Sequence, residues 1–126
     1  MSEYQYNSVD WFEIATDKPE EARSFYGELF GWTFGADKDS GRPYREITAS
    51  GAGRPSGGLF DSGGRFPNYA IFYVVVQDVA ATLAKAESLG AKTLVPPTTT
   101  DHGLVFAQLQ DSSGSHFGIF TPPPVA

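Results

Sequence analysis

The sequence contains no cysteine among its 126 residues. Disulfide bridges, thiolate metal sites and cysteine nucleophiles are therefore excluded, and packing alone must hold the folded chain together. Because the fold does not depend on a disulfide, the chain can exist in any redox compartment.

Two kinds of targeting segment are also missing. No stretch approaches the ~20 consecutive apolar residues that a membrane span requires. The first ten residues have neither the basic start nor the apolar run of a signal peptide. These two absences predict a cytoplasmic protein that has no membrane partner.

Basic residues are scarce. Nine Lys and Arg stand against fifteen Asp and Glu, which gives a formal charge of -6 at pH 7. Because nucleic-acid binders neutralise phosphates with clustered Lys and Arg, we expect no nucleic-acid partner. Apolar residues make up 40% of the chain and aromatic residues 14%. That is enough to fill the core of one domain and to line a small-molecule site as well.

The first half of the chain predicts a βαβββ series. Residues 9–14 have the alternation of a strand, and apolar residues recur at helical spacing after Pro19, with Thr16 or Asp17 as the N-cap and Gly31 as the end of the helix. Three short strands are expected over residues 32–35, 44–49 and 57–60, the first two separated by the polar segment 37–42.

A second series of the same kind follows Gly63-Gly64. Residues 69–76 form an apolar, β-branched run, and a helix is expected over 79–89 with Asp78 as its N-cap. Further strands are expected over 92–95, 104–109 and 116–120, with turns at Pro96-Pro97 and at 111–114. The threonines at 98–100 are either a lid or a solvent loop.

The two halves match at a constant shift of 60 residues. Trp11 falls on Ile71, and the segment Gly58-Leu59-Phe60 falls on Gly118-Ile119-Phe120. An internal duplication is the simplest explanation of this match. The chain is therefore predicted to be one α+β domain over residues 1–126, made of two modules at about 8–62 and 68–121.

Six short motifs carry a resemblance to a known family. Their order and spacing are similar to those of the vicinal oxygen chelate superfamily, which includes glyoxalase I, extradiol dioxygenases and bleomycin resistance proteins. The resemblance covers about residues 9–120. It implies two tandem βαβββ modules forming a cupped mixed sheet, commonly in a dimer, with a ligand or metal inside. The motifs are Trp11-Phe12-Glu13-Ile14, Phe25-Tyr26, Leu29-Phe30-Gly31-Trp32, Val76-Gln77-Asp78-Val79, Leu89-Gly90 and Asp111-Ser112-Ser113-Gly114.

The same resemblance locates four metal positions. Metal-dependent members resemble one another in having His, Gln or Glu on the first strand of each module and a carboxylate on the last. In this chain those positions fall on Trp11, Gly58, Ile71 and Gly118, which offer no nitrogen or oxygen ligand suited to a divalent ion. We therefore expect no metal, no cofactor and no metal-dependent glyoxalase or dioxygenase reaction.

We interpret this replacement as a site reshaped to hold an organic molecule. Trp11 would supply a stacking face, and the two glycines would leave room beneath it, although Gly118 can equally be a turn or packing glycine. Strand alternation places a further set of aromatic and polar side chains on the same face as Trp11, while Phe12 and Ile14 pack under the helices. The predicted ligand-binding residues are Trp11, Glu13, Tyr44, Glu46, Ile71, Tyr73, Phe106, Gln108, His116 and Gly118.

Two of these residues are candidates for catalysis. A carboxylate within an apolar strand is unfavourable unless it is paired or solvated. Glu13 is therefore either a general base or a carboxylate held by a hydrogen bond or by an ion pair with an arginine such as Arg45. His116 is either a proton carrier or a hydrogen-bonded strand histidine.

Three functions are consistent with these patterns. The leading hypothesis is a metal-independent protein that binds a small organic molecule, aromatic or cationic, in an aromatic-lined cup. The alternatives are a metal-free lyase or isomerase using Glu13 or His116 for proton transfer, and a structural or regulatory module filled by its own side chains. Whether the chain is an enzyme stays open. The exposed edges of each module's sheet predict a homodimer.

Overall fold

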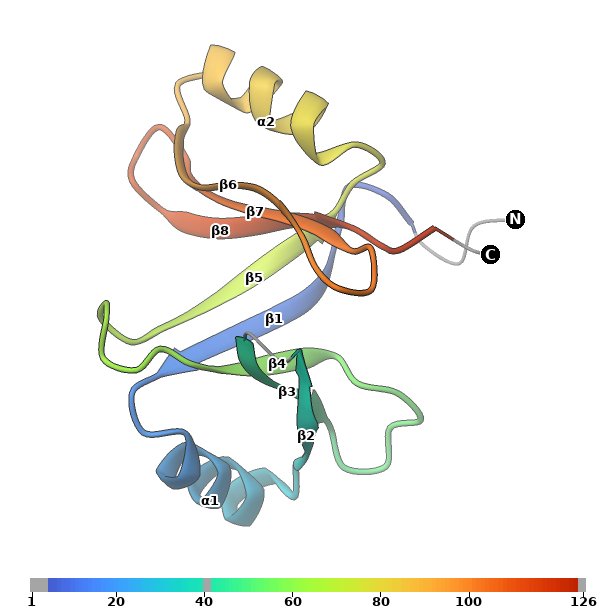
Figure 1. The fold of residues 1–126 in the computed structure, drawn as a ribbon, viewed down its shortest axis with the longest axis vertical. Coiled ribbons are helices and arrows are strands. Elements are labelled where there is room, and N and C mark those ends of the chain that lie inside the picture. The colour runs from blue at the N-terminus through green and yellow to red at the C-terminus, as the bar shows by residue number, and fades with distance from the viewer. Residues whose placement is uncertain (1–4, 40–41, 125–126) are drawn as a thin grey trace. The chain divides into compact units, whose positions relative to one another are not determined.

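The computed structural model describes residues 5–39 and 42–124. Strands and helices within these ranges follow the order βαβββ twice, so the predicted α+β class with two tandem βαβββ series is confirmed (Figure 1). The elements are β1 (Ser8–Thr16), α1 (Pro19–Phe30), β2 (Thr33–Asp39), β3 (Arg42–Thr48), β4 (Gly57–Asp61), β5 (Tyr69–Val75), α2 (Val79–Ser88), β6 (Lys92–Thr99), β7 (Val105–Gln110) and β8 (His116–Thr121).

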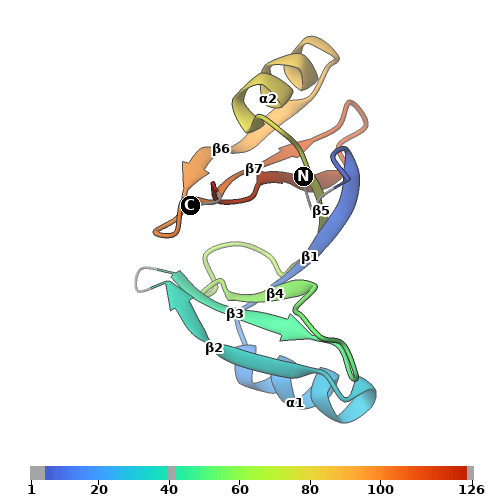
Figure 2. The same ribbon diagram turned by 90° about the vertical axis from the view of Figure 1, so that its right-hand side faces the viewer.

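The chain forms two compact units. The N-terminal unit is Trp11–Ala70, and the C-terminal unit comprises the residues from Ile71 onward together with those before Trp11. Strand order is β2-β3-β4-β1 within the N-terminal unit and β5-β8-β7-β6 within the C-terminal unit. In both units the first and last strands pair in parallel, and the other neighbours pair in antiparallel fashion. Figure 2 shows α1 against the strands of its own unit.

The strand register within each of the two units agrees with the 60-residue shift. Glu13 is opposite Gly58 on the β1–β4 pair, and Tyr73 is opposite Gly118 on the β5–β8 pair. Each partner therefore has its counterpart 60 residues later. The equivalence aligns a carboxylate in the first unit with a tyrosine in the second.

Each unit has its own hydrophobic core between helix and sheet. In the N-terminal unit, Ile14, Ile47 and Leu59 are buried, and Phe12 and Tyr26 pack against them. Phe12 and Ile14 thus lie on the helix-facing side of β1, as alternation predicts. The opposite face of β1 therefore carries Trp11 and Glu13.

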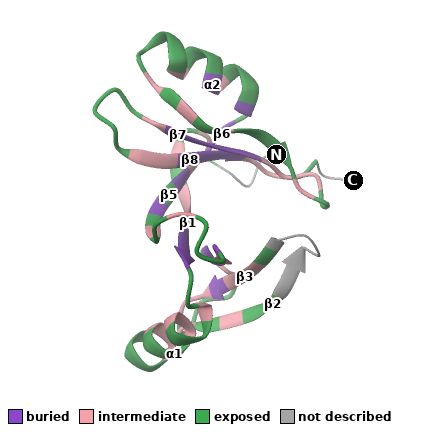
Figure 3. Cartoon of the chain, turned by 60° about the vertical axis from the view of Figure 1, so that its left-hand side comes forward, coloured by how far each residue is buried: buried purple, intermediate pink, exposed green. Residues whose placement is uncertain are grey.

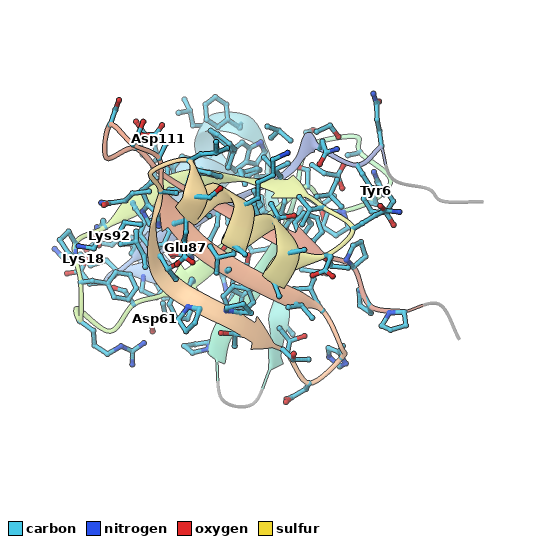
Figure 4. All side chains as sticks on the ribbon, turned by 90° about the horizontal axis from the view of Figure 1, so that it is seen from above. Tyr6, Lys18, Asp61, Glu87, Lys92 and Asp111 are labelled. Carbon is cyan, nitrogen blue, oxygen red and sulfur yellow. The ribbon has the colours of Figure 1, made fainter. Side chains whose placement is uncertain are left out.

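In the C-terminal unit, α2 contributes Val79 and Leu83 to a core with Ala107, Leu109 and Ile119 of β7 and β8. Figure 3 shows buried residues concentrated on the strands and α2 largely exposed. At the start of β6, the Thr93 hydroxyl donates to the Glu87 carboxylate of α2 over 2.7 Å. Figure 4 labels Glu87 on this helix and Lys92 at the start of the strand.

The two helices begin differently. Asp78 caps α2 as predicted, its carboxylate accepting from the Ala81 amide over 2.9 Å. For α1, however, the prediction of Thr16 or Asp17 is wrong, since the N-cap is Lys18 and makes no side-chain capping bond. Pro19 begins the helix and disfavours helical dihedrals in the preceding residue, which shifts the cap to Lys18.

Parts of two predicted connections are instead strand. The polar segment 37–42 was expected to separate two strands, but β2 extends to Asp39 and β3 begins at Arg42. An edge strand tolerates polar residues because pairing on one side already satisfies part of its backbone. Residues 40–41 lie outside the described residues.

Pro96-Pro97 likewise lies within β6, together with Thr98 and Thr99, so the expected turn and the lid-or-loop alternatives are wrong for these positions. The strand is at the end of its unit's sheet, and its register shifts between Val95 and Thr98. Proline lacks a donor and is accommodated on such edges and irregularities.

Candidate functional site

Tyr44 connects three strands on the face of the N-terminal unit that points away from α1. Tyr44 belongs to β3, and its side chain lies over Gly58 of β4. A Cβ added to Gly58 would come within 3.0 Å of three atoms of the Tyr44 side chain. Its hydroxyl oxygen then accepts from the indole nitrogen of Trp11 on β1, over 3.0 Å. The structure thus brings together the predicted residues Trp11, Tyr44 and Gly58.

Glu13 is next to this arrangement, on the same face of β1. Its side chain is deeply buried, with 2% of the residue exposed. The Tyr69 hydroxyl donates to Glu13 Oε2 over 2.5 Å. The hydrogen-bond alternative for Glu13 is therefore observed. Arg45, the suggested ion-pair partner, donates to the carbonyl of Gly35 over 3.3 Å.

A series of aromatic rings joins the two tyrosines within the N-terminal unit. Ring centroids are 6.3 Å apart for Tyr44 and Phe60, 6.2 Å for Phe60 and Phe66, and 5.7 Å for Phe66 and Tyr69. The last two pairs are stacked, at interplanar angles of 20° and 16°. Sequence reasoning missed Phe60 and Phe66 as neighbours of this site and Tyr69 as the partner of Glu13. Only the return of the chain at the start of β5 brings Tyr69 to β1.

The C-terminal unit carries a polar chain on its corresponding face. A ring nitrogen of His116 lies 2.9 Å from Gln108 Oε1, and Gln108 Nε2 donates to the Tyr73 hydroxyl over 2.7 Å. Since the amide oxygen only accepts, His116 donates through Nε2 in this arrangement. His116 is thus a hydrogen-bonded strand histidine, which was one of its two predicted roles.

The remaining predicted residues divide between the units. Glu46 is opposite Gly58 in the N-terminal unit and is half-buried. Ile71 and Phe106 are buried in the C-terminal unit. The ten predicted residues thus comprise Trp11, Glu13, Tyr44 and Glu46 in one unit and Ile71, Tyr73, Phe106, Gln108, His116 and Gly118 in the other.

Burial lowers the pKa of His116 from its usual value of 6.5. The folded state therefore holds fewer protons than the unfolded chain between the two pKa values, so stability falls as the pH drops below about 6.5. We expect acidification from neutral pH to lower the free energy of unfolding more for the wild type than for His116→Gln. Urea unfolding of both proteins across this pH range measures the difference. A difference independent of pH would contradict the shifted pKa.

The four residues that the family resemblance places at metal positions have side chains and surroundings that do not suit a metal ion. Trp11 and Ile71 have no donor suited to a divalent ion. At Gly58 and Gly118 the space a carboxylate side chain would enter is taken by the rings of Tyr44 and Tyr73. This corrects the expectation that the glycines leave room for a ligand. Among the described residues, no group of three or more His, Asp or Glu side chains is arranged to hold a metal ion.

A surface depression of about 280 Å³ lies elsewhere in the N-terminal unit. It is lined by Arg23, Ser24, Trp32, Thr33 and Phe34, and none of these is among the predicted site residues. Trp32, one of its lining residues, also belongs to the aromatic cluster of the core, where its ring stacks on that of Tyr26 with centroids 5.3 Å apart.

Within the described ranges, neither helix has the length and apolar character required to cross a membrane.

The two βαβββ units define the class of this protein. Residues 8–119 match the family model of the glyoxalase/bleomycin resistance protein/dioxygenase superfamily, and the chain belongs to this family. The resemblance noted from the sequence motifs is thereby confirmed.

The individual relatives of this chain share about a third of its residues or fewer. CFP32, named as a glyoxylase in Mycobacterium tuberculosis and Mycobacterium bovis, is 32% identical over 115 residues, covering 90% of this chain and 44% of CFP32. The chain thus spans less than half of that relative. Hypothetical protein BH1468 of Bacillus halodurans has a TM-score of 0.71 at 14% identity, covering 97% of this chain and 99% of that one. Methylmalonyl-CoA epimerase of Mycobacterium tuberculosis has a TM-score of 0.66 at 12% identity, covering 98% and 93%. At such identities these two structures show the fold alone.

Proposed function

We propose that this chain is a metal-independent protein that binds a small organic molecule of aromatic or cationic character. The observation that carries the proposal is the tyrosine over glycine at both carboxylate positions of the family. Tyr44 covers Gly58, and Tyr73 covers Gly118. Aromatic surface thus stands where the family's metal ligands would lie, and aromatic walls with a few polar groups are characteristic of small-molecule sites.

The polar groups have separate roles in this proposal. In the N-terminal unit, Glu13 supplies a carboxyl group on the same face of β1 as Trp11. In the C-terminal unit, Gln108 and His116 supply hydrogen-bonding groups. The ligand-binding set otherwise stays as predicted from the sequence. We further propose that the protein is a homodimer, since β2 and β6 end the strand order of their units and leave edges that a second copy can cover. A cytoplasmic location is also part of the proposal.

A metal-free lyase or isomerase is the second candidate. It is favoured by the hydrogen bond between His116 and Gln108, which fixes the orientation of the imidazole ring. Burial lowers the pKa of His116 and so favours the neutral ring, the form that accepts a proton. Glu13 is the other candidate base. In this function a chelator leaves turnover unchanged, and Glu13→Gln and His116→Ala each reduce it.

Ligand titration of chelator-treated protein tests the leading proposal. The chain has two tryptophans, so Trp32→Phe leaves Trp11 as the sole indole reporter. We expect the Trp11 emission to change saturably with at least one of benzyltrimethylammonium, benzyl alcohol and benzoate, because the ligand replaces water around the ring. Readdition of Zn²⁺ or Ni²⁺ should leave the affinity unchanged. Absence of saturable binding of all three probes at millimolar concentration, or binding only after metal is restored, would overturn the proposal.

A further inference from the structure

The surface depression of the N-terminal unit lies at the edge of that unit, where α1 and β2 adjoin. Its described lining residues are Arg23 and Ser24 of α1, Trp32 after the helix, and Thr33 and Phe34 of β2. β2 ends the strand order of its unit and contacts α1 (Figure 2). The volume of about 280 Å³ is just below the ~300–1,000 Å³ of pockets for drug-sized ligands, so the space suits a molecule with a single ring.

The C-terminal unit fills the equivalent helix position differently. α1 begins at Pro19 and α2 at Val79, so the shift of 60 residues equates Arg23 with Leu83. Leu83 is buried in the core of its unit, with 6% of the residue exposed. The Arg23 side chain is 38% exposed. A guanidinium group with access to solvent therefore stands where the second unit has a core leucine.

The link between helix and edge strand also differs between the units. In the C-terminal unit, Thr93 of β6 bonds Glu87 of α2 over 2.7 Å. The residue equivalent to Glu87 is Gly27, which has no side chain to form such a bond. A Cβ at Gly27 would meet the Trp32 carbonyl oxygen at 3.5 Å. The bridge of the second unit thus has no side-chain counterpart at Gly27, one turn after Arg23.

The lining of the depression combines a positive charge with aromatic side chains. Among the described residues that line it, Arg23 is the only charged one. An arginine stays protonated at neutral pH, and its fork of N–H donors matches the two oxygens of a carboxylate. Trp32 and Phe34 supply the aromatic part of the lining. A carboxylate attached to an aromatic ring complements both parts.

Arg23 is held only weakly by its partner within the protein. Its Nη1 atom lies 3.8 Å from Oε1 of Glu20, one turn earlier on α1, and the Glu20 side chain is 73% exposed. Exposed ion pairs of this kind contribute little to stability, because water screens them and both side chains lose freedom. The carboxylate of a ligand can therefore replace Glu20 beside Arg23 at little cost.

We propose that this depression binds a small aromatic carboxylate, with Arg23 pairing with the carboxylate and Trp32 and Phe34 contacting the ring. The inference goes beyond the proposed function, because the depression shares no residue with the proposed ligand-binding set. Arg23 determines the preference for an anion. The two aromatic side chains contribute to the affinity whether or not the ligand is charged.

A pair of probes of nearly equal shape isolates the charge. Benzoate and benzamide are both planar, but only benzoate is an anion. The chain has two tryptophans, so Trp11→Phe leaves Trp32 as the sole indole reporter. We expect the Trp32 emission to change saturably with millimolar benzoate, and benzamide to bind at least about fivefold more weakly. Arg23→Gln should bring the two dissociation constants to within about twofold of each other.

Arg65→Gln is the matched control for Arg23→Gln. Arg65 lies between β4 and β5, is exposed, and is not among the described residues that line the depression. Its substitution removes the same charge and should leave the preference for benzoate unchanged, which separates a local ion pair from a change in net charge. A preference that survives Arg23→Gln, or that Arg65→Gln removes equally, would overturn the inference.

Glu20→Gln tests the same ion pair without altering the lining. It should strengthen benzoate binding about twofold, because Arg23 loses its competing carboxylate. Glu28→Gln removes the same charge from another exposed position of α1 and should have a smaller effect. This comparison remains decisive even where Arg23→Gln does not fold. Benzoate binding that Glu20→Gln leaves unchanged or weakens would contradict pairing with Arg23.

The two tryptophan reporters keep this inference separate from the proposed function. Equal affinity for benzoate and benzamide, or no saturable response of Trp32 to millimolar benzoate, rejects the aromatic carboxylate site. The titration that follows Trp11 in the Trp32→Phe background tests the proposed function by itself. Either proposal can therefore fail while the other stands.

Discussion

Replacing Gly118 with alanine should lower the free energy of unfolding by about 3 kcal/mol, near the upper end for overpacking of a core. The added Cβ would lie under 3.0 Å from three ring atoms of Tyr73, and Tyr73 is only 4% exposed. The ring has little space to move into, so the clash must be relieved by shifting the strands or by expelling the tyrosine. Urea denaturation followed by far-ultraviolet circular dichroism measures the loss.

Gly35→Ala is the matched control for this substitution. Gly35 also lies in a strand, and its new Cβ would meet its nearest neighbour at 3.9 Å, an ordinary contact. It should change stability by less than about 0.5 kcal/mol. In the Tyr73→Leu background, Gly118→Ala should be better tolerated because the ring is gone. An equal loss in both backgrounds would show that the tyrosine does not cover Gly118.

Tyr69→Phe should lower the free energy of unfolding by about 2 kcal/mol. The substitution removes the hydroxyl that donates to Glu13 over 2.5 Å while the carboxylate remains 2% exposed. Hydrogen bonds to charged groups contribute about 1.5–3 kcal/mol, and the loss falls on a group that water reaches poorly. Thermal and urea unfolding of the single variant give the magnitude.

A double-mutant cycle tests whether this loss belongs to the Tyr69–Glu13 pair. Glu13→Gln weakens the same hydrogen bond from the other side, so the two substitutions together should cost less than the sum of their separate effects. A coupling free energy of at least about 1 kcal/mol is expected. Strict additivity would assign the effect of Tyr69→Phe to packing against Phe66 and would remove Tyr69 as the residue that positions Glu13.

Several local features were predictable because they depend on neighbours in sequence. The cap at Asp78 and the helical spacing around Leu83 need only a few adjacent residues to be recognised. Residues 37–39 and Pro96-Pro97 were expected to lie in connections but lie in strands, for the opposite reason. Their backbone is organised by pairing with another strand, and an edge strand accepts residues that a central strand excludes.

The candidate site was predictable only in part. Alternation along β1 placed Trp11 and Glu13 on one face, and that placement depends on a local period of two residues. The partner of Glu13 was beyond this reasoning, because Tyr69 is 56 residues away. The directions of the Tyr44 and Tyr73 rings could not be predicted either, since the rotamer of each side chain depends on its packing against neighbouring strands.

The sequence by itself determined the doubled βαβββ order and the absence of thiol chemistry. These follow from composition, local periodicity and a shift of 60 residues, whereas the four metal positions expected at Trp11, Gly58, Ile71 and Gly118 are implied only by the family resemblance. Only the tertiary structure decided what fills the space above the glycines and what holds the buried carboxylate. Both depend on contacts between side chains of different strands, and the local pattern of residues does not determine which distant residues come into contact.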